Sequence, residues 1–354
     1  MATLSDTQFF LVTTIVKVAL VFFIVLTTVA YLTWLERKVV AHIQARWGPY
    51  RVGPHGLLQP LADGLKFLFK EDIVPAEVNQ GVYWLAPLLG FTLALLSFAV
   101  IPFGGSFNLF GRPVPLQVTD VNVGLLFVFA VTSLGVYSIA LAGWSSNSKY
   151  PLFGALRSSA QMISYELALG LAAIGVLMLA GTLSLRGIVE QQARPWSSGG
   201  LLSFLPHWNL FLQPVGFLIF FIAGIAETNR IPFDLPEGET ELVGGYHTEY
   251  SSFKFAMFFM SEYANMITAS CLATLLFFGG WLGPVFGPSW MRVLLPVFWF
   301  CLKVFCFLFF YIWLRGTLPR FRYDQLMAFG WKFLLPVALL NVLVTSFFVA
   351  WAGS

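Results

Sequence analysis

The sequence predicts an all-α integral membrane protein, on the evidence of its composition and of the spacing of its apolar segments. Of the 354 residues, 58% are hydrophobic and only 10% are charged, whereas a soluble domain carries about a quarter of charged residues. So little charge cannot cover a surface that faces water, which excludes a soluble enzyme and a disordered chain. Eight segments have about the 20 apolar residues that a helix needs to cross a bilayer.

The eight segments form one predicted transmembrane domain over residues 1–354. The predicted spans are residues 9–35, 82–103, 121–143, 160–181, 208–228, 253–280, 291–314 and 327–351. The halves of the chain show no similarity to each other that would indicate an internal repeat.

The basic residues predict the orientation of these spans. Fourteen Lys and Arg residues lie in or beside the loops 36–81, 144–159, 229–252 and 315–326, against four in the loops of the opposite side. Loops rich in Lys and Arg stay in the cytoplasm. We therefore predict that these four loops face the cytoplasm and that both termini lie on the outer side.

The sequence gives no indication of a prosthetic group. Cys271, Cys301 and Cys306 lie in apolar segments without a metal-binding spacing, so we expect them to be buried apolar residues. No Gly-rich phosphate loop follows a strand pattern, and a net charge of +3 without a basic run does not indicate nucleic acid. We expect no metal, flavin or iron–sulfur cluster in this chain, so any redox chemistry must come from partners.

The first cytoplasmic loop contains a predicted amphipathic helix. Its apolar residues recur at i, i+4, i+7 and i+8, and its charged residues fall on the other face: Leu61, Leu65, Leu68 and Phe69 against Asp63, Lys66 and Lys70. This pattern is typical of a helix on the membrane surface. A helix that packs its apolar face on the bundle of the same chain would show it equally.

Acidic residues gather in one part of the chain. Seven of the 17 lie between residues 227 and 262: Glu227, Asp234, Glu237, Glu239, Glu241, Glu249 and Glu262. Glu262 falls inside a predicted span, and so does Glu166, six residues after the start of the span 160–181. A charge at the centre of a span costs at least about 2.5 kcal/mol, which favours a function for these residues.

Acids held close together in a low dielectric titrate as a coupled set, as a proton relay requires. Two other interpretations stay open at this point. Glu227 ends its span and could reach the headgroups, and residues 234–249 could form a solvated loop. Lys303 lies near the middle of the span 291–314, where a lysine must be paired or neutral, and we expect a buried carboxylate as its partner.

Several motifs resemble those of one known family. Residues 56–66 (GLLQPLADGLK) with Lys70-Glu71, and residues 232–239 (PFDLPEGE) through Gly244, resemble the two signatures of the quinone-channel membrane subunit of respiratory complex I. Its bacterial form is the H subunit, and its mitochondrial form carries the number 1. The resemblance continues through residues 143–148, 164–166, 226–230 and 319–324 and covers nearly the whole chain, except for the loops 104–118 and 183–207 and the termini.

The resemblance implies roles for individual residues. Arg37 and Arg46 resemble the basic residues that line the quinone passage, and Asp63 and Lys66 resemble its entrance. The acidic set resembles the one that links the quinone chamber to the antiporter-like subunits and acts as a proton relay: Glu166, Glu227, Asp234, Glu237, Glu239, Glu241, Glu249 and Glu262. Lys303 occupies a lysine position of the family, 12 residues before Arg315.

The resemblance also implies a function and a setting. The chain is expected to be a membrane-arm subunit of the proton-translocating NADH:quinone oxidoreductase, with quinone as substrate and no catalysis alone. Its expected partners are the hydrophilic-arm iron–sulfur and quinone-site subunits, the antiporter-like membrane subunits and membrane lipids. A bacterial inner membrane is favoured over the mitochondrial one by the long N-terminus and the extended outer loops.

Three other functions were weighed against this one. The chain could be the corresponding anchor subunit of a related membrane-bound hydrogenase or of a ferredoxin- or deazaflavin-linked complex, although both loop signatures favour the quinone-reducing form. A stand-alone secondary transporter would be expected to show inverted repeats. A purely structural anchor would leave Glu166, Glu262 and Lys303 without an explanation.

Overall fold

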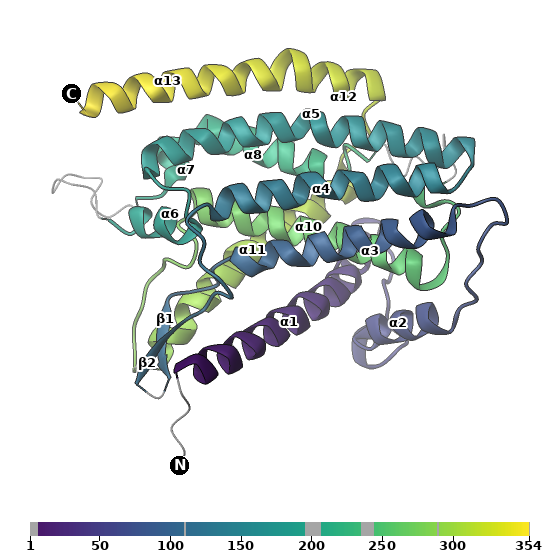
Figure 1. Ribbon diagram of the computed structural model, residues 1–354, viewed down its shortest axis with the longest axis horizontal. Helices are drawn as coiled ribbons and strands as arrows, with labels where there is room; N and C mark the ends of the chain where they lie inside the picture. Colours follow the sequence, from purple (N-terminus) through teal and green to yellow (C-terminus); the bar gives the residue numbers. More distant parts are fainter. Residues whose placement is uncertain (1–5, 110, 195–206, 235–243, 289, 354) are drawn as a thin grey trace.

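The structure is a bundle of long apolar helices. The computed structural model describes residues 6–109, 111–194, 207–234, 244–288 and 290–353. Within these residues, six helical stretches are long and apolar enough to cross a membrane: α1 (Asp6–Ile43), α3 (Gln80–Leu96) with the 3₁₀ turn Ser97–Val100, α4 (Gly124–Ser145), α5 (Lys149–Ala180), α11 (Met291–Thr317) and the stretch Tyr323–Trp351 (Figure 1). Six of the predicted spans are thereby confirmed as apolar helices of sufficient length.

The other two predicted spans differ from simple apolar helices. Residues 208–228 form a short helix α7 (Asn209–Leu212) and, after Gln213, the 14-residue helix α8 (Pro214–Glu227). Residues 253–280 form α10 (Ser252–Phe277), which is long enough but too polar to meet the same criterion of hydropathy. The physical reason is position: most of α10 is buried, and α1, α3, α8 and α11 pack against it, so it faces protein as much as lipid.

Small residues bring the central helices close together. α5 packs against α4, α8 and α13 (Leu335–Gly353). Ala168 and Ala172 of α5, like Ala223 and Ala226 of α8, are fully or almost fully buried. Small side chains let the backbones of membrane helices approach closely, and this close packing fixes the helices that carry the acidic residues.

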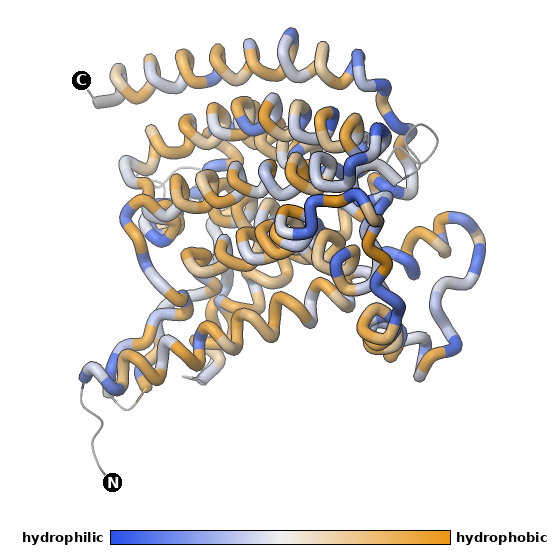
Figure 2. The backbone as a smooth tube through the Cα atoms, turned by 45° about the vertical axis from the view of Figure 1, so that its right-hand side comes forward, coloured by the Kyte–Doolittle hydropathy of each residue, from blue (hydrophilic) through white to orange (hydrophobic). Residues whose placement is uncertain are grey.

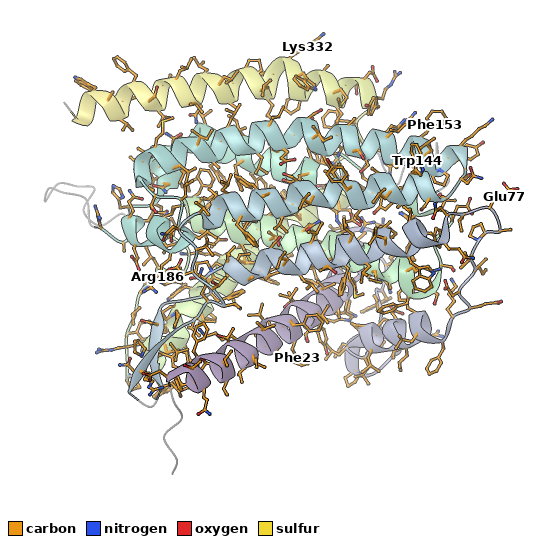
Figure 3. The ribbon with its side chains drawn as sticks, in the orientation of Figure 1. Phe23, Glu77, Trp144, Phe153, Arg186 and Lys332 are labelled. Carbon is orange, nitrogen blue, oxygen red and sulfur yellow. The ribbon has the colours of Figure 1, made fainter. Side chains whose placement is uncertain are left out.

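The four charged loops meet at one end of the bundle. The first loop is bound to the second by Asn147 Nδ2 and Glu77 Oε2 at 3.4 Å, and the third is bound to the fourth by Phe321 N and Pro232 O at 3.0 Å. Figure 3 shows Glu77 and Trp144 at this end and Arg186 at the opposite end. The grouping of the loops agrees with the alternation that the basic residues predict.

The opposite end carries the remaining small elements. The strands β1 (Ser106–Leu109) and β2 (Arg112–Pro115) pair as an antiparallel hairpin, and α6 (Leu185–Gln192) lies near the ends of α5 and α10. Hydrophobic residues dominate the long helices, and hydrophilic ones gather in the connections (Figure 2).

The amphipathic helix of the first loop is present as α2 (Gln59–Phe69). No residue of α2 is buried, and Leu61 and Phe69 expose 63% and 86% of their surface. The alternative in which this apolar face packs on the bundle of the same chain is therefore wrong. An exposed apolar stripe favours contact with lipid or with another subunit.

Three details of the prediction need correction. α5 begins at Lys149 rather than at residue 160, so Glu166 follows its start by 17 residues, about 25 Å along the axis. The last helical stretch is interrupted, because a π-helical turn (Gly330–Leu334) separates α12 (Tyr323–Phe329) from α13. Cys271 is buried as expected, but Cys301 and Cys306 are exposed on α11.

A glycine pair on α4 tests the close packing. A Cβ at Gly143 would lie 2.6 Å from the carbonyl oxygen of Pro151, whereas a Cβ at Gly135 would meet no atom within 4 Å. We expect Gly143→Ala to destabilise the fold by about 1–3 kcal/mol through overpacking. Thermal unfolding in mild detergent measures this change. Gly135→Ala on the same helix is the matched control, and equal unfolding temperatures for the two variants would contradict the prediction.

Candidate functional site

Glu36 is the centre of a buried group of charged residues. It lies on α1, and its exposed fraction is 4%. Tyr263 of α10 donates a hydrogen bond to Glu36 Oε2 at 2.6 Å, and Arg315 of α11 forms an ion pair with Glu36 Oε1. A carboxylate removed from water needs such partners, and here two other helices supply them.

Arg230 joins Glu36 to a second carboxylate. It follows α8, and its Nη1 lies 3.5 Å from Glu36 Oε1, while its Nε lies 3.4 Å from Glu262 Oε1 on α10. The guanidinium also lies over the Tyr263 ring, 4.2 Å from the centroid, a favourable cation–π geometry. One buried cation therefore spans two carboxylates from two helices.

Glu262 and Glu227 share a cavity inside the bundle, which we call the inner cavity. Its volume is about 30 Å³, and its polar lining includes Thr228, Asn265 and Ser138. A neighbouring cavity of about 20 Å³ is lined by Glu227, Asn265 and Thr132. A cavity needs about 10–15 Å³ to hold one water molecule and two or more polar partners to bind it, so both cavities have room for water between the carboxylates.

Glu166 extends the acidic row to a further helix. Ser133 of α4 donates a hydrogen bond to Glu166 Oε1. Glu227 accepts a hydrogen bond from Thr132, the neighbour of Ser133, and lies close enough to Glu166 for the two negative charges to repel each other. The row therefore runs from Glu166 on α5 through Glu227 on α8 to Glu262 on α10.

A larger cavity lies on the other side of Glu36, and we call it the α1–α10 cavity. Its volume is about 450 Å³, and its lining combines charged and apolar side chains: Glu36, Arg37, Val40, Arg46, Trp47, Phe259, Tyr263 and Arg315. A wider recess of about 670 Å³ shares Trp47, Gly48 and Pro49 with it and reaches Arg51 and Gln59. The structure thus brings Arg37 and Arg46 to one cavity, as their predicted common role requires.

Asp63 and Lys66 lie on α2 beside this cavity. Arg37 Nη1 donates to Asp63 Oδ2 at 2.7 Å, and Lys66 Nζ lies 3.9 Å from Asp63 Oδ1. Gln59 Nε2 holds the other end of the cluster by donating to Asp63 Oδ1 at 2.8 Å. Asp63 therefore links α2 to α1, whereas Lys66 is largely exposed.

The acids of the third loop do not join the buried row. Asp234 pairs with Arg320 of the fourth loop at 3.1 Å, and Phe233 stacks on Phe321. Glu249 contributes its backbone carbonyl, which accepts a hydrogen bond from the Tyr83 hydroxyl at 2.6 Å. Glu237, Glu239 and Glu241 lie outside the described residues.

Lys303 has a different environment from the one that we expected. Its ammonium donates to the backbone carbonyls of Phe278, Gly280 and Leu282 at 2.7–2.9 Å, and it lies 4.8 Å from the Trp208 ring centroid. The prediction of a carboxylate partner is wrong. Three carbonyl oxygens just beyond the end of α10 replace the carboxylate, because the unpaired carbonyls at a helix C-terminus attract a cation.

The sequence prediction missed four residues of the buried group: Glu36, Arg230, Tyr263 and Arg315. For Glu36, a signal exists in the sequence. Val25, Val29 and Leu32 precede it at spacings of four, three and four residues and are buried with it, so the charged residue continues the apolar stripe that faces the bundle. A carboxylate on the buried stripe of a helix must find a partner.

The fold and the buried ion pairs define a polytopic helical membrane protein with a row of intramembrane carboxylates. The chain also matches the family described as NADH dehydrogenase over residues 16–346. It therefore belongs to that family, in the branch formed by the H subunits of NADH-quinone oxidoreductase.

Three relatives illustrate the similarity, and each is named as an H subunit of NADH-quinone oxidoreductase. The one numbered 2 in Koribacter versatilis is 59% identical, over 96% of this chain and 98% of the relative. The one numbered 1 in Solibacter usitatus is 52% identical over 97% and 98%, and that of Thermomicrobium roseum is 55% identical over 93% of each. The chain therefore aligns with these relatives over nearly their whole length.

Arg230 provides a test of the buried group. We expect Arg230→Met to lower the stability by about 3–5 kcal/mol, because it leaves Glu36 and Glu262 buried with fewer partners. The amount of folded chain in membranes and its unfolding temperature in detergent measure the loss. Arg186→Met breaks the exposed pair of Arg186 with Glu190 and should cost less than about 1 kcal/mol. Equal losses would show that the buried contacts of Arg230 do not stabilise the fold.

Proposed function

We propose that the chain admits quinone to a proton-pumping NADH-quinone oxidoreductase and couples quinone reduction to proton translocation. One observation carries the proposal. Arg230 contacts both Glu36, which lines the α1–α10 cavity, and Glu262, which lines the inner cavity. A change of charge in the larger cavity is therefore one residue away from the acidic row.

The α1–α10 cavity suits a quinone. Its volume of about 450 Å³ lies in the usual range of small-molecule sites, which are mostly apolar and have a few polar groups that orient the ligand. Val40, Trp47 and Phe259 offer apolar surface to the ring and the tail. Arg37 and Arg46 offer donors to the carbonyl oxygens of the quinone, and Asp63 and Lys66 stand beside the entrance.

The two small cavities suit proton transfer. Water in them would bridge Glu227 and Glu262, and Glu166 continues the row through its interaction with Glu227. Asp234 and Glu249, with Glu237, Glu239 and Glu241, would extend the relay through the third loop. Lys303 would act at the far end of α10, where its charge interacts with the end of the helix that carries Glu262.

The coupling that we propose is electrostatic. Electrons delivered by a neighbouring subunit reduce the quinone to the quinol, which takes up two protons. The gain of negative charge on the quinone before protonation would weaken the hold of Arg230 and Arg315 on Glu36. A freer Arg230 would then favour the ionised form of Glu262, so that protons move along the row without being delivered to the quinone itself.

The proposal includes the setting of the chain. α7 with α8, and α10, would complete eight spans, with the four joined loops on the cytoplasmic side and both termini outside. The hydrophilic-arm subunits with their iron–sulfur clusters would contact the loop end, and the antiporter-like subunits would contact the membrane helices. The inner membrane of a bacterium is the expected location, because the relatives above come from bacteria.

Neutral replacements test the acidic row. In membrane vesicles that contain the whole complex, we expect Glu227→Gln and Glu262→Gln to lower NADH-driven proton uptake at least about tenfold, because a carboxamide cannot carry the proton. Glu190→Gln on the exposed helix α6 is the control. Quinone reduction with full proton uptake in both variants would remove these residues from the relay.

Photolabelling tests the ligand site. A quinone analogue with a photoreactive group on its ring should label Trp47 or Phe259, and an excess of the natural quinone should prevent the labelling. Peptide mass spectrometry of the irradiated complex identifies the labelled residues. Labelling confined to other subunits, with none on this chain, would contradict the assignment of the α1–α10 cavity.

A further inference from the structure

The C-terminal end of α2 is capped by the start of α10. The Ser252 hydroxyl lies within hydrogen-bond distance of two carbonyl oxygens there, at 2.9 Å from Phe67 O and 3.0 Å from Lys70 O. Carbonyls at the end of a helix lack partners within it, so Ser252 satisfies a need of α2. Ser252 has a φ of +54°, a conformation that costs a residue with a side chain free energy.

A second pair of hydrogen bonds continues this junction. The backbone N–H of Ile73 donates to Ser251 Oγ at 2.8 Å, and Ser251 Oγ lies 3.2 Å from Ile73 O. The Phe67 and Phe255 rings pack at 6.1 Å beside them. The segment that leaves α2 is therefore joined to α10 by backbone and side-chain contacts.

Lys254 closes the junction with a buried charge. Its side chain exposes 2% of its surface, and its ammonium lies 3.0 Å from Asp72 Oδ2. The same ammonium lies over two rings of α3, at 4.1 Å from the Trp84 centroid and 4.6 Å from that of Tyr83. Cation–π contacts are strongest when the cation is desolvated, so Lys254 ties together α10, α3 and the segment after α2.

Aromatic packing holds this cage in place. Tyr83 and Tyr250 stack with centroids 4.2 Å apart, and the Tyr250 hydroxyl contacts Ser145 Oγ of α4 at 3.1 Å. Burial raises the pKa of Tyr250 to about 12, and the hydrogen bond with Ser145 opposes the rise. The Tyr250 hydroxyl therefore stays protonated at physiological pH and keeps this contact.

The other end of α2 is held less firmly. Its tie to α1 is the pair of Arg37 with Asp63, in which the arginine side chain exposes 52% of its surface. Exposed pairs contribute little to stability, whereas the Lys254 side chain is almost completely shielded. α2 thus has one fixed end at α10 and one looser end beside the α1–α10 cavity.

We propose that Lys254 and Asp72 are positioning residues that anchor α2 to α10 and thereby shape the wall along which the tail of the substrate passes. This inference rests on the proposed function, because it takes the α1–α10 cavity as the quinone site. The exposed apolar residues of α2 would form the wall, and the clamp would keep that wall in place before the substrate arrives. Preorganisation of this kind lowers the cost of binding.

The experiment uses the whole complex with Lys254→Met and Asp72→Asn. Met fills the aromatic cage without a charge, and Asp72 is 35% exposed, so its replacement is the milder change. We expect both variants to raise the KM for a long-tailed isoprenoid quinone about 3- to 10-fold, with less than about a twofold change for a short-tailed analogue. Lys254→Arg, which keeps the charge, should retain most of the wild-type behaviour, and Lys70→Gln on exposed α2 is the control.

Hydrogen exchange supplies a readout that does not depend on the quinone. Peptides that contain the Ile73 amide should exchange faster in both variants and at the wild-type rate in the control. Unchanged exchange, or faster exchange with an unchanged ratio of the two KM values, would overturn the proposal. Failure of the proposed function would appear instead as the absence of photolabelling in the wild-type chain.

Discussion

The arrangement of the bundle depends on burying Arg230 between two carboxylates. A charge inside a membrane bundle is expensive, and a buried ion pair offsets that cost only when its geometry and hydrogen bonds are good. Glu36, Glu262, Tyr263 and Arg315 supply these contacts from α1, α10 and α11. A shift of any of these helices would separate a charge from its partner, so the ion pairs fix the relative positions of the helices around the α1–α10 cavity.

The charged end of the molecule uses a different means of attachment. Its loops come from distant parts of the sequence and are joined by single polar contacts, such as Asp234 with Arg320, supported by stacked rings such as Phe233 on Phe321. Each contact links two loops that leave different helices. The loop end is therefore a connected surface, on which a neighbouring subunit would meet all four loops at once.

The sequence predicts the long apolar helices and the amphipathic helix well, because these follow from local hydropathy and periodicity. α8 and α10 are harder to predict: α8 is interrupted near Gln213, and α10 carries the polar side chains of the site. The row of Glu166, Glu227 and Glu262 follows from the cost of membrane charges. The partners of Lys303 could not be predicted, because backbone carbonyls leave no trace in a sequence, and Glu36 was missed because it sits beside Arg37 in a segment that reads as the start of a loop.

The length of α1 has a mechanical consequence. Its 38 residues extend about 57 Å, nearly twice the roughly 30 Å of the hydrocarbon layer, and in Figure 1 it is inclined to α3, α4 and α5. Even a tilt of about 40° leaves part of this rod outside the hydrocarbon. Glu36 and Arg37 stand near its emerging end, so bilayer thickness sets the height at which the cavity opens toward the lipid tails where a greasy carrier dissolves.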